Sequence, residues 1–128
     1  METIPRRNTR GQSLMELAIV LPLLLLLVLA AVDYGRVFFC FQEVESAAAA
    51  GAQFGCLTTA NATNTILITS NALLQASGIA NLSPIVTSTF ANTNLVVTVT
   101  ATFRPFIAWP WLPTNVPIQR TVNMLVLQ

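Results

Sequence analysis

A glutamate lies at the start of the most apolar stretch of this sequence, where a charged side chain is energetically unfavourable. Glu16 directly precedes residues 17–32, a run without any charged residue, and it follows Gly11 by five positions. A carboxylate at the centre of a bilayer costs about 2.5–3.5 kcal/mol on insertion scales, and less near the interface. An ionisable group in such a segment is therefore a candidate functional group whose partner must be identified.

The length of the apolar run and the charges before it predict a membrane-spanning helix. Residues 12–32 would form a helix of about 30 Å, which matches the thickness of a hydrocarbon core. Three arginines precede this helix, at Arg6, Arg7 and Arg10. Positively charged flanks stay on the cytoplasmic side of the membrane. We therefore expect residues 1–11 to be a cytoplasmic leader and the C-terminal part of the chain to be exported.

The order of these residues resembles the processing site of type IV pilin precursors. In that family a prepilin peptidase cleaves after the glycine, and the new N-terminus is usually methylated. The resemblance implies cleavage between Gly11 and Gln12, which makes Glu16 the fifth residue of the mature chain. In a filament, the Glu16 carboxylate of a neighbouring subunit can neutralise the new ammonium group, because buried charges are tolerated only as pairs. The alternative is an uncleaved signal anchor whose Glu16 reaches the lipid headgroups.

Composition argues against several classes of function. The chain contains no histidine, which removes the commonest metal ligand and general base. No lysine is present, and after Glu45 the only charged side chains are Arg104 and Arg120. Such a chain has no basic patch that could follow the phosphates of a nucleic acid. Catalytic pairs, zinc-ligand spacing and phosphate-binding glycine loops are also missing, so we expect no enzyme, cofactor or metal.

The two cysteines are expected to be separate thiols. Cys40 and Cys56 are sixteen residues apart in a segment that we expect to be one helix. That spacing places them about 24 Å apart along the helix axis, far beyond the reach of a disulfide. Small apolar thiols of this kind are usually buried.

One long helix is predicted over residues 12–56, spanning the membrane to about residue 33. Pro22 interrupts the apolar run and is expected to kink the helix, which membrane helices tolerate. Beyond the membrane, apolar side chains recur at helical spacing and predict a buried stripe. The residues of this predicted stripe are Phe38, Phe41, Val44 and Ala48.

A polar motif marks the place where this helix should leave the bilayer. It consists of Asp33, Tyr34, Gly35 and Arg36. Asp33 and Arg36 are three residues apart and can pair on one helix face. Tyr34 suits the membrane interface because its ring is amphipathic. Anchoring at the interface would account for the whole motif.

Small residues line one face of the helix further along. Ala47, Gly51 and Gly55 recur every four residues, a pattern that lets helices approach closely. This face packs either on the protein's own exported domain, which we favour, or on another subunit.

These blocks together resemble the N-terminal domain of TadE-like proteins, which are pseudopilins or minor pilins of tight-adherence pilus systems. The resemblance rests on residues 10–16, 21–22, 33–36 and 47–52, which keep their order and spacing. It covers about residues 6–55 and departs from the family at Leu17, where an aromatic residue is common.

The resemblance implies a structural protein that assists or joins a pilus or a related secretion system. Its expected partners are the prepilin peptidase, major and minor pilins, the inner-membrane assembly platform and membrane lipid. Its expected location is the inner membrane, with one span and an exported C-terminal domain. The alternative is a membrane-anchored binding protein that never polymerises.

Residues 57–128 are predicted to form a small exported α+β domain that packs on the long helix. A loop is expected over residues 57–64, followed by a short helix over 65–77 that ends at Gly78. The apolar contacts of this helix are assigned to Ile66, Leu67, Leu73 and Leu74. The fold class is therefore α+β, with a long N-terminal helix, a short helix and a small antiparallel sheet.

Three strands are predicted for the sheet, over residues 85–90, 95–103 and 118–127. Residues 95–103 alternate between apolar side chains and a face that is mostly threonine. Arg120 interrupts the apolar face of the last strand. Its partner could be the C-terminal carboxylate, a backbone carbonyl or solvent at the sheet edge.

The segment between the last two strands is too apolar for an ordinary hairpin loop. It contains Phe106, Trp109 and Trp111. Such a loop is typical of membrane-interface contact or of a buried subunit surface. It could also fold back over the domain's own core.

Overall fold

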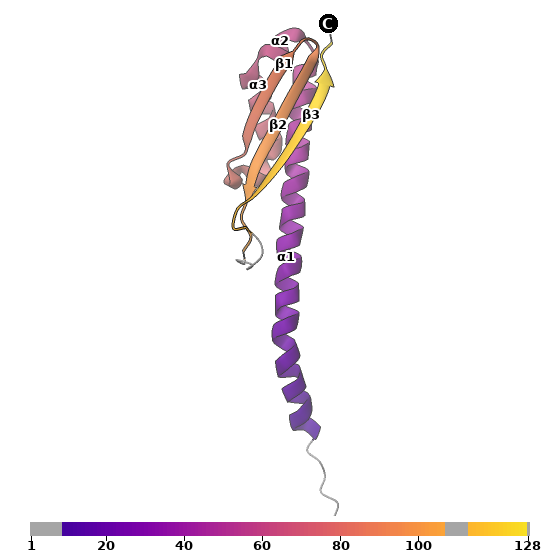
Figure 1. Cartoon of the computed structure of the whole chain (residues 1–128), viewed down its shortest axis with the longest axis vertical. Helices are drawn as coiled ribbons and strands as arrows, with labels where there is room; N and C mark the ends of the chain where they lie inside the picture. The colour runs from indigo at the N-terminus through magenta and orange to yellow at the C-terminus, as the bar shows by residue number, and fades with distance from the viewer. Residues whose placement is uncertain (1–8, 107–112, 128) are drawn as a thin grey trace, which may run out of the picture. The chain divides into compact units, whose positions relative to one another are not determined.

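The computed structural model describes residues 9–106 and 113–127 of the chain. The chain divides into two units, residues 1–34 and 35–128. Helix α1 (Thr9–Cys56) contributes to both units, and all other elements belong to the second. These elements are helices α2 (Thr59–Thr63) and α3 (Thr65–Gln75), the 3₁₀ segment η1 (Ala76–Leu82), and strands β1 (Ile85–Ala91), β2 (Asn94–Phe103) and β3 (Val116–Leu125) (Figure 1). The predicted α+β fold class is confirmed.

The described part of the first unit is the apolar beginning of α1. The helix begins at Thr9, three residues before the predicted start, and continues through Pro22. The most hydrophobic 18-residue window of α1 has none of its residues buried by the protein, and α1 is long and apolar enough to cross a membrane. The leader before Thr9, with Arg6 and Arg7, lies outside the described residues.

The second unit is built on a three-stranded antiparallel sheet in the order β1-β2-β3 (Figure 1). Central Val97 lies opposite Ser88 of β1 and Val122 of β3. The predicted alternation of β2 is confirmed, because every second side chain is at most 2% exposed. These inward-facing residues are Leu95, Val97, Val99, Ala101 and Phe103. The sheet therefore has one apolar face that must be covered.

The second part of α1, residues 35–56, covers that face. Cys40, Val44, Ala47 and Ala48 belong to one buried cluster with Val99, Ala101 and Phe103. The predicted stripe is confirmed at Val44 and Ala48, which are buried, and at Phe41, which packs against this cluster, but it is wrong at Phe38, which is 55% exposed. Small residues decide which side of α1 can approach the sheet.

Gly51 and Gly55 show how close that approach is. A Cβ built on Gly51 would lie 3.2 Å from the Ala72 Cβ of α3 and 3.3 Å from a Val97 methyl of β2. A Cβ built on Gly55 would overlap the Leu95 Cδ2. The small residues of α1 therefore pack against the protein's own sheet and α3.

Residues 57–64 are not the loop that was predicted, because they contain α2. The Thr58 hydroxyl accepts a hydrogen bond from the Asn61 backbone N–H at 3.2 Å and caps this short helix. Asn64 then caps α3 by accepting from the Leu67 N–H at 3.1 Å. Thr and Asn are preferred N-cap residues, so their positions were the signal that the loop prediction missed.

The predicted inner face of α3 is wrong. Ile68 and Ala72 are fully buried, whereas Ile66 and Leu74 are 78% and 76% exposed. The face of α3 that fits against the small residues of α1 is buried. The apolar side chains on the other faces of α3 are more numerous than those on the buried face, and they stay exposed. The predicted stop at Gly78 is also wrong, because α3 ends at Gln75 and runs directly into η1.

Strand β3 starts at Val116, two residues before its predicted start, and its end is fixed by backbone hydrogen bonds. The Val126 N–H donates to the Thr93 carbonyl at 2.8 Å, and the Leu127 N–H donates to the Cys56 carbonyl at 2.9 Å. The second bond ties the end of the described chain to the end of α1.

We expect Gly55→Ala to destabilise the second unit, because its methyl group would overlap fully buried Leu95. Overpacking costs about 1–3 kcal/mol, which exceeds the gain of up to about 1 kcal/mol from higher helix propensity. The matched control is Gly35→Ala in the same helix, where an added Cβ meets no atom within 4 Å. Thermal unfolding of the detergent-solubilised chain, followed by circular dichroism, measures the difference. Equal melting temperatures for the two variants would contradict the close approach of α1.

Candidate functional site

The predicted processing residues lie in the first turns of α1. Gly11, Gln12 and Glu16 are exposed, and a Cβ built on Gly11 meets no atom within 4 Å. Gln12 and Glu16 are separated by one helical turn and therefore share a helix face. The first N–H groups of a helix have no intrahelical partner, so this end opens more easily than the middle. Local opening is what a peptidase would need to reach the bond after Gly11.

The boundary motif contains one buried and one exposed side chain in direct succession. Asp33 is 6% exposed, whereas Tyr34 is 76% exposed. An added Cβ on Gly35 meets no atom within 4 Å. The pairing of Asp33 with Arg36 stays a prediction.

Arg36 connects the start of the second unit to the segment after β2. Its guanidinium carbon lies 4.1 Å from the centroid of the Phe106 ring and 5.3 Å from that of Phe103. Both distances are within the range of cation–π attraction. Phe106 is 75% exposed and so is not part of the core. Trp109 and Trp111, the other residues of the predicted interface loop, lie outside the described residues.

Arg120 has a partner that the sequence did not identify. Its guanidinium carbon lies 3.9 Å from the centroid of the Phe41 ring, and its Nη2 lies 3.9 Å from Glu45 Oε2. Both partners come from α1, which explains why an arginine is tolerated on the inner side of β3. The salt bridge is half-exposed and long, so the contact with Phe41 is the better-defined part of the arrangement.

The two cysteines are both free thiols, and they differ in exposure. Cys40 is 2% exposed, whereas Cys56 is half-buried and donates a hydrogen bond from its Sγ to the Gln53 carbonyl at 3.2 Å. Burial raises the pKa of the Cys40 thiol, and the negative charge of Glu43 raises it further. Cys40 is therefore a core residue with little thiolate character.

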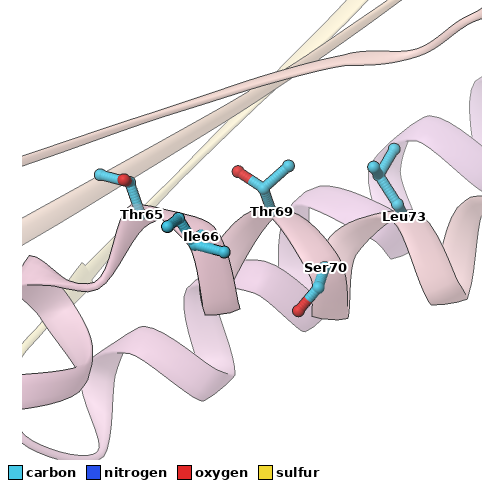
Figure 2. A pocket seen from close by; sticks show the side chains of 5 residues that line it. All are labelled: Thr65, Ile66, Thr69, Ser70 and Leu73. Atoms are coloured by element: carbon cyan, nitrogen blue, oxygen red, sulfur yellow. The ribbon is translucent and has the colours of Figure 1, made fainter.

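The outward side of α3 carries an exposed apolar surface with an adjoining open groove. Figure 2 shows Thr65, Thr69 and Leu73 pointing from the same side of the helix, with Ile66 beside them. The groove has a volume of about 380 Å³ and is lined by uncharged side chains only. Ile66, Leu67, Leu73 and Leu74, which were predicted to be core residues, instead make up much of this surface.

Metal chemistry finds no support in the described residues. Among them, no three His, Cys, Asp or Glu side chains lie close enough together to hold a metal ion.

The fold and these features define a protein with one membrane-length N-terminal helix that continues into a small α+β unit. The family model of TadE-like proteins matches residues 11–53. The match begins at Gly11 and extends through the boundary motif to the small residues of α1, so the resemblance found in the sequence is confirmed over these residues. The match covers about a third of the chain and suggests a protein associated with tight-adherence pili. Neither the curated proteins nor the solved structures include a match to this chain.

We expect alkylating reagents to modify Cys56 before Cys40, because Cys40 is buried and has a raised pKa. Each unit by which a thiol pKa rises reduces the thiolate population about tenfold at neutral pH. Mass spectrometry after timed iodoacetamide treatment at pH 8, with Cys40→Ala and Cys56→Ala for assignment, measures the two rates. In denaturant the rates should converge. Faster modification of Cys40 in the folded protein would contradict its position in the core.

Proposed function

We propose that this protein is a pilin-like subunit that acts in the assembly of a tight-adherence pilus. The observation that carries the proposal is the match of residues 11–53 to TadE-like proteins, since this segment contains Gly11 and Glu16 in prepilin spacing. The site is a processing and assembly site: it supplies a cleavable bond and a carboxylate, and it performs no catalysis.

In this proposal the first part of α1 holds the protein in the inner membrane before assembly. Arg6, Arg7 and Arg10 keep the leader in the cytoplasm, and residues 12–33 span the bilayer. Residues 34–56 then continue α1 on the other side of the membrane, where residues 57–128 fold against them. Support comes from the most hydrophobic window of α1, which has no buried residue and whose apolar surface needs a covering other than this chain.

Cleavage after Gly11 would change the electrostatics of the helix end. It removes three arginines and creates an ammonium group at Gln12, close to the apolar run. When α1 leaves the membrane to join a helical assembly, this ammonium group and the Glu16 carboxylate lose their contact with water and headgroups. Pairing between neighbouring subunits offsets that loss and also fixes their axial register.

The exported unit has the surface expected of a subunit that packs against others. No Asp or Glu follows Glu45, and only two arginines do, so little charge keeps the surface hydrated. The exposed apolar residues of α3, with Ile66 and Leu74 more than three-quarters exposed, add a surface that other pilins can cover. In our proposal the partners are major and minor pilins, the prepilin peptidase and the assembly platform.

Processing provides the first test. In cells with an active prepilin peptidase, the membrane-extracted protein should have the mass of a chain that begins at Gln12, with or without one methyl group. Gly11→Leu should accumulate the uncut precursor, because a larger residue obstructs the peptidase while the fold leaves space at this position. Gly35→Leu is the matched control and should be processed normally. A wild-type mass that retains residues 1–11 would refute cleavage.

Glu16→Ala should be inserted and cleaved but should impair assembly. Removing the carboxylate lowers the cost of insertion, whereas an unpaired buried ammonium group destabilises a subunit contact by about 3–5 kcal/mol. Pilus number and the protein content of sheared filaments and membranes measure assembly. Glu16→Gln should fail in the same way, and Glu16→Asp should restore part of the function.

Two outcomes separate the parts of this argument. Accumulation of uncut Glu16→Ala precursor would make Glu16 part of the peptidase recognition signal and leave the charge pair without support. Normal pili from processed Glu16→Ala would refute the charge pair. If deletion of the whole protein leaves pilus number unchanged and the protein occurs only in membranes, the assembly role itself is wrong.

A further inference from the structure

A second pocket lies at the end of the sheet where η1 leads into β1, β2 ends and β3 begins. Its volume is about 430 Å³, which is within the usual range for small-ligand sites. Its polar lining comes from Asn81, Ser83, Thr102, Arg104 and Asn115. Three segments distant in sequence therefore contribute donors to one hollow.

The chemistry of this lining favours an anion with several oxygen atoms. The guanidinium of Arg104 offers a fork of N–H donors, and the Asn amides and the Ser and Thr hydroxyls offer further donors. Among the described residues, no carboxylate lines the pocket. Phosphate has both the charge and the number of acceptors to use such a set.

Arg104 differs from the other two arginines of the second unit in its surroundings. Arg36 lies over two phenylalanine rings, and Arg120 lies over Phe41 beside Glu45. Arg104 is exposed, and within the described residues it forms no salt bridge. Because no acidic residue follows Glu45 in the sequence, the unit's later segments have no Asp or Glu side chain to pair with it.

The position of the pocket in the second unit indicates where the phosphate would come from. Arg104 directly follows Phe103 and is two residues before Phe106, and both rings lie within 5.3 Å of the Arg36 guanidinium carbon. Arg36 is only four residues beyond Val32, the last residue of the uncharged apolar run. If α1 is the membrane anchor, the chain leaves the bilayer at the lipid headgroups close to Arg36 in sequence, and Arg104 belongs to the segment whose rings contact Arg36.

We propose that the Arg104 pocket binds the phosphate group of an anionic phospholipid in the leaflet that faces the exported unit. The inference rests on the membrane anchoring in the proposed function and adds a ligand to it. Arg104 pairs with the phosphate, while Asn81, Ser83, Thr102 and Asn115 can donate to its remaining oxygens or to a polar headgroup. Lipid bound there would hold the unit against the membrane before assembly, and extraction would have to break this contact.

Lipid retention by the full chain tests the proposal. The protein is purified in non-ionic detergent, supplied with phosphatidylglycerol or phosphatidylcholine, and examined by native mass spectrometry. We expect preferential retention of phosphatidylglycerol, reduced about tenfold or more in Arg104→Gln, because a charge-assisted hydrogen bond is lost. Arg120→Gln removes the same charge outside the pocket and should retain lipid as the wild type does.

A second pair of variants tests the pocket without removing an arginine. Asn115→Asp places a carboxylate beside Arg104 and should reduce retention by repelling phosphate and by pairing with the guanidinium. Asn123→Asp makes the same change on β3 outside the pocket and should have no effect. Circular dichroism establishes that each variant is folded before its lipid retention is compared.

The remaining outcomes overturn the proposal. Equal retention of the two lipids would exclude a preference for anionic phospholipid, and wild-type retention by folded Arg104→Gln would exclude Arg104 as the partner of a lipid phosphate. If inorganic phosphate at millimolar concentration binds the pocket but phosphatidylglycerol is not retained, the pocket is a free-phosphate site and the lipid source is wrong. Carbonate extraction of membranes distinguishes these failures from failure of the proposed function, because a protein released by carbonate is not anchored by α1.

Discussion

The close approach of α1 to the sheet is the constraint on which the second unit depends. Gly51 and Gly55 leave no unused space between α1, β2 and α3, and their neighbours Ala47, Ala48 and Ala52 are fully buried. Because only this side of α1 is flat enough to touch the sheet, it determines the rotation of the helix. The same side sets the position of α3, whose Ile68 and Ala72 pack against it. The remaining apolar residues of α3 are exposed as a result of this fit.

Much of the fold could be predicted from local patterns, and the errors share a physical cause. Strict alternation in β2 was sufficient because a half-buried strand has only two faces. The inner face of α3 could not be derived in this way, since apolar residues occur on several of its sides. Tertiary packing selected the side with Ile68 and Ala72, which faces the small residues of α1. The missed α2 is different, because Thr58 was a local capping signal that the sequence contained.

Some candidate functional residues could be found from local sequence spacing, whereas others depend on contacts between segments that are far apart in the chain. Gly11, Glu16 and the boundary motif belong to one helix, so sequence spacing alone was enough to propose them as candidates. The partners of Arg120 and the surroundings of Arg104 involve segments far apart in the chain. Arg120 contacts Phe41 and Glu45 across more than seventy intervening residues. No periodicity in the sequence carries that information, and only the register of β3 against the rest of the unit supplies it.

The two parts of helix α1 use apolar side chains of different size. The difference follows from what surrounds each part. Residues 17–32 are rich in leucine and valine and are exposed almost throughout, whereas residues 47–55 are rich in alanine and glycine and mostly buried. Lipid tails adapt to bulky side chains of any shape, so the first part needs only hydrophobicity. A folded sheet cannot adapt in this way, so the second part needs small residues at fixed spacing.

The change between these two requirements falls at residues 33–36, where the two units meet in the sequence. A helix that used bulky residues throughout would lose the close contact with the sheet, and one that used small residues throughout would be a poor membrane anchor. The charged groups of the protein follow the same division. Arg6, Arg7, Arg10 and Glu16 precede the uncharged run and Asp33 follows it, so these charges lie at its ends, where insertion costs least. In the second unit, Arg36 and Arg120 lie over aromatic rings, Glu45 faces Arg120, and Arg104 lines a polar pocket. Most of the few charged side chains in the described part of this unit therefore serve a contact or a pocket, because the uncharged surface of the sheet and of α3 has no use for them.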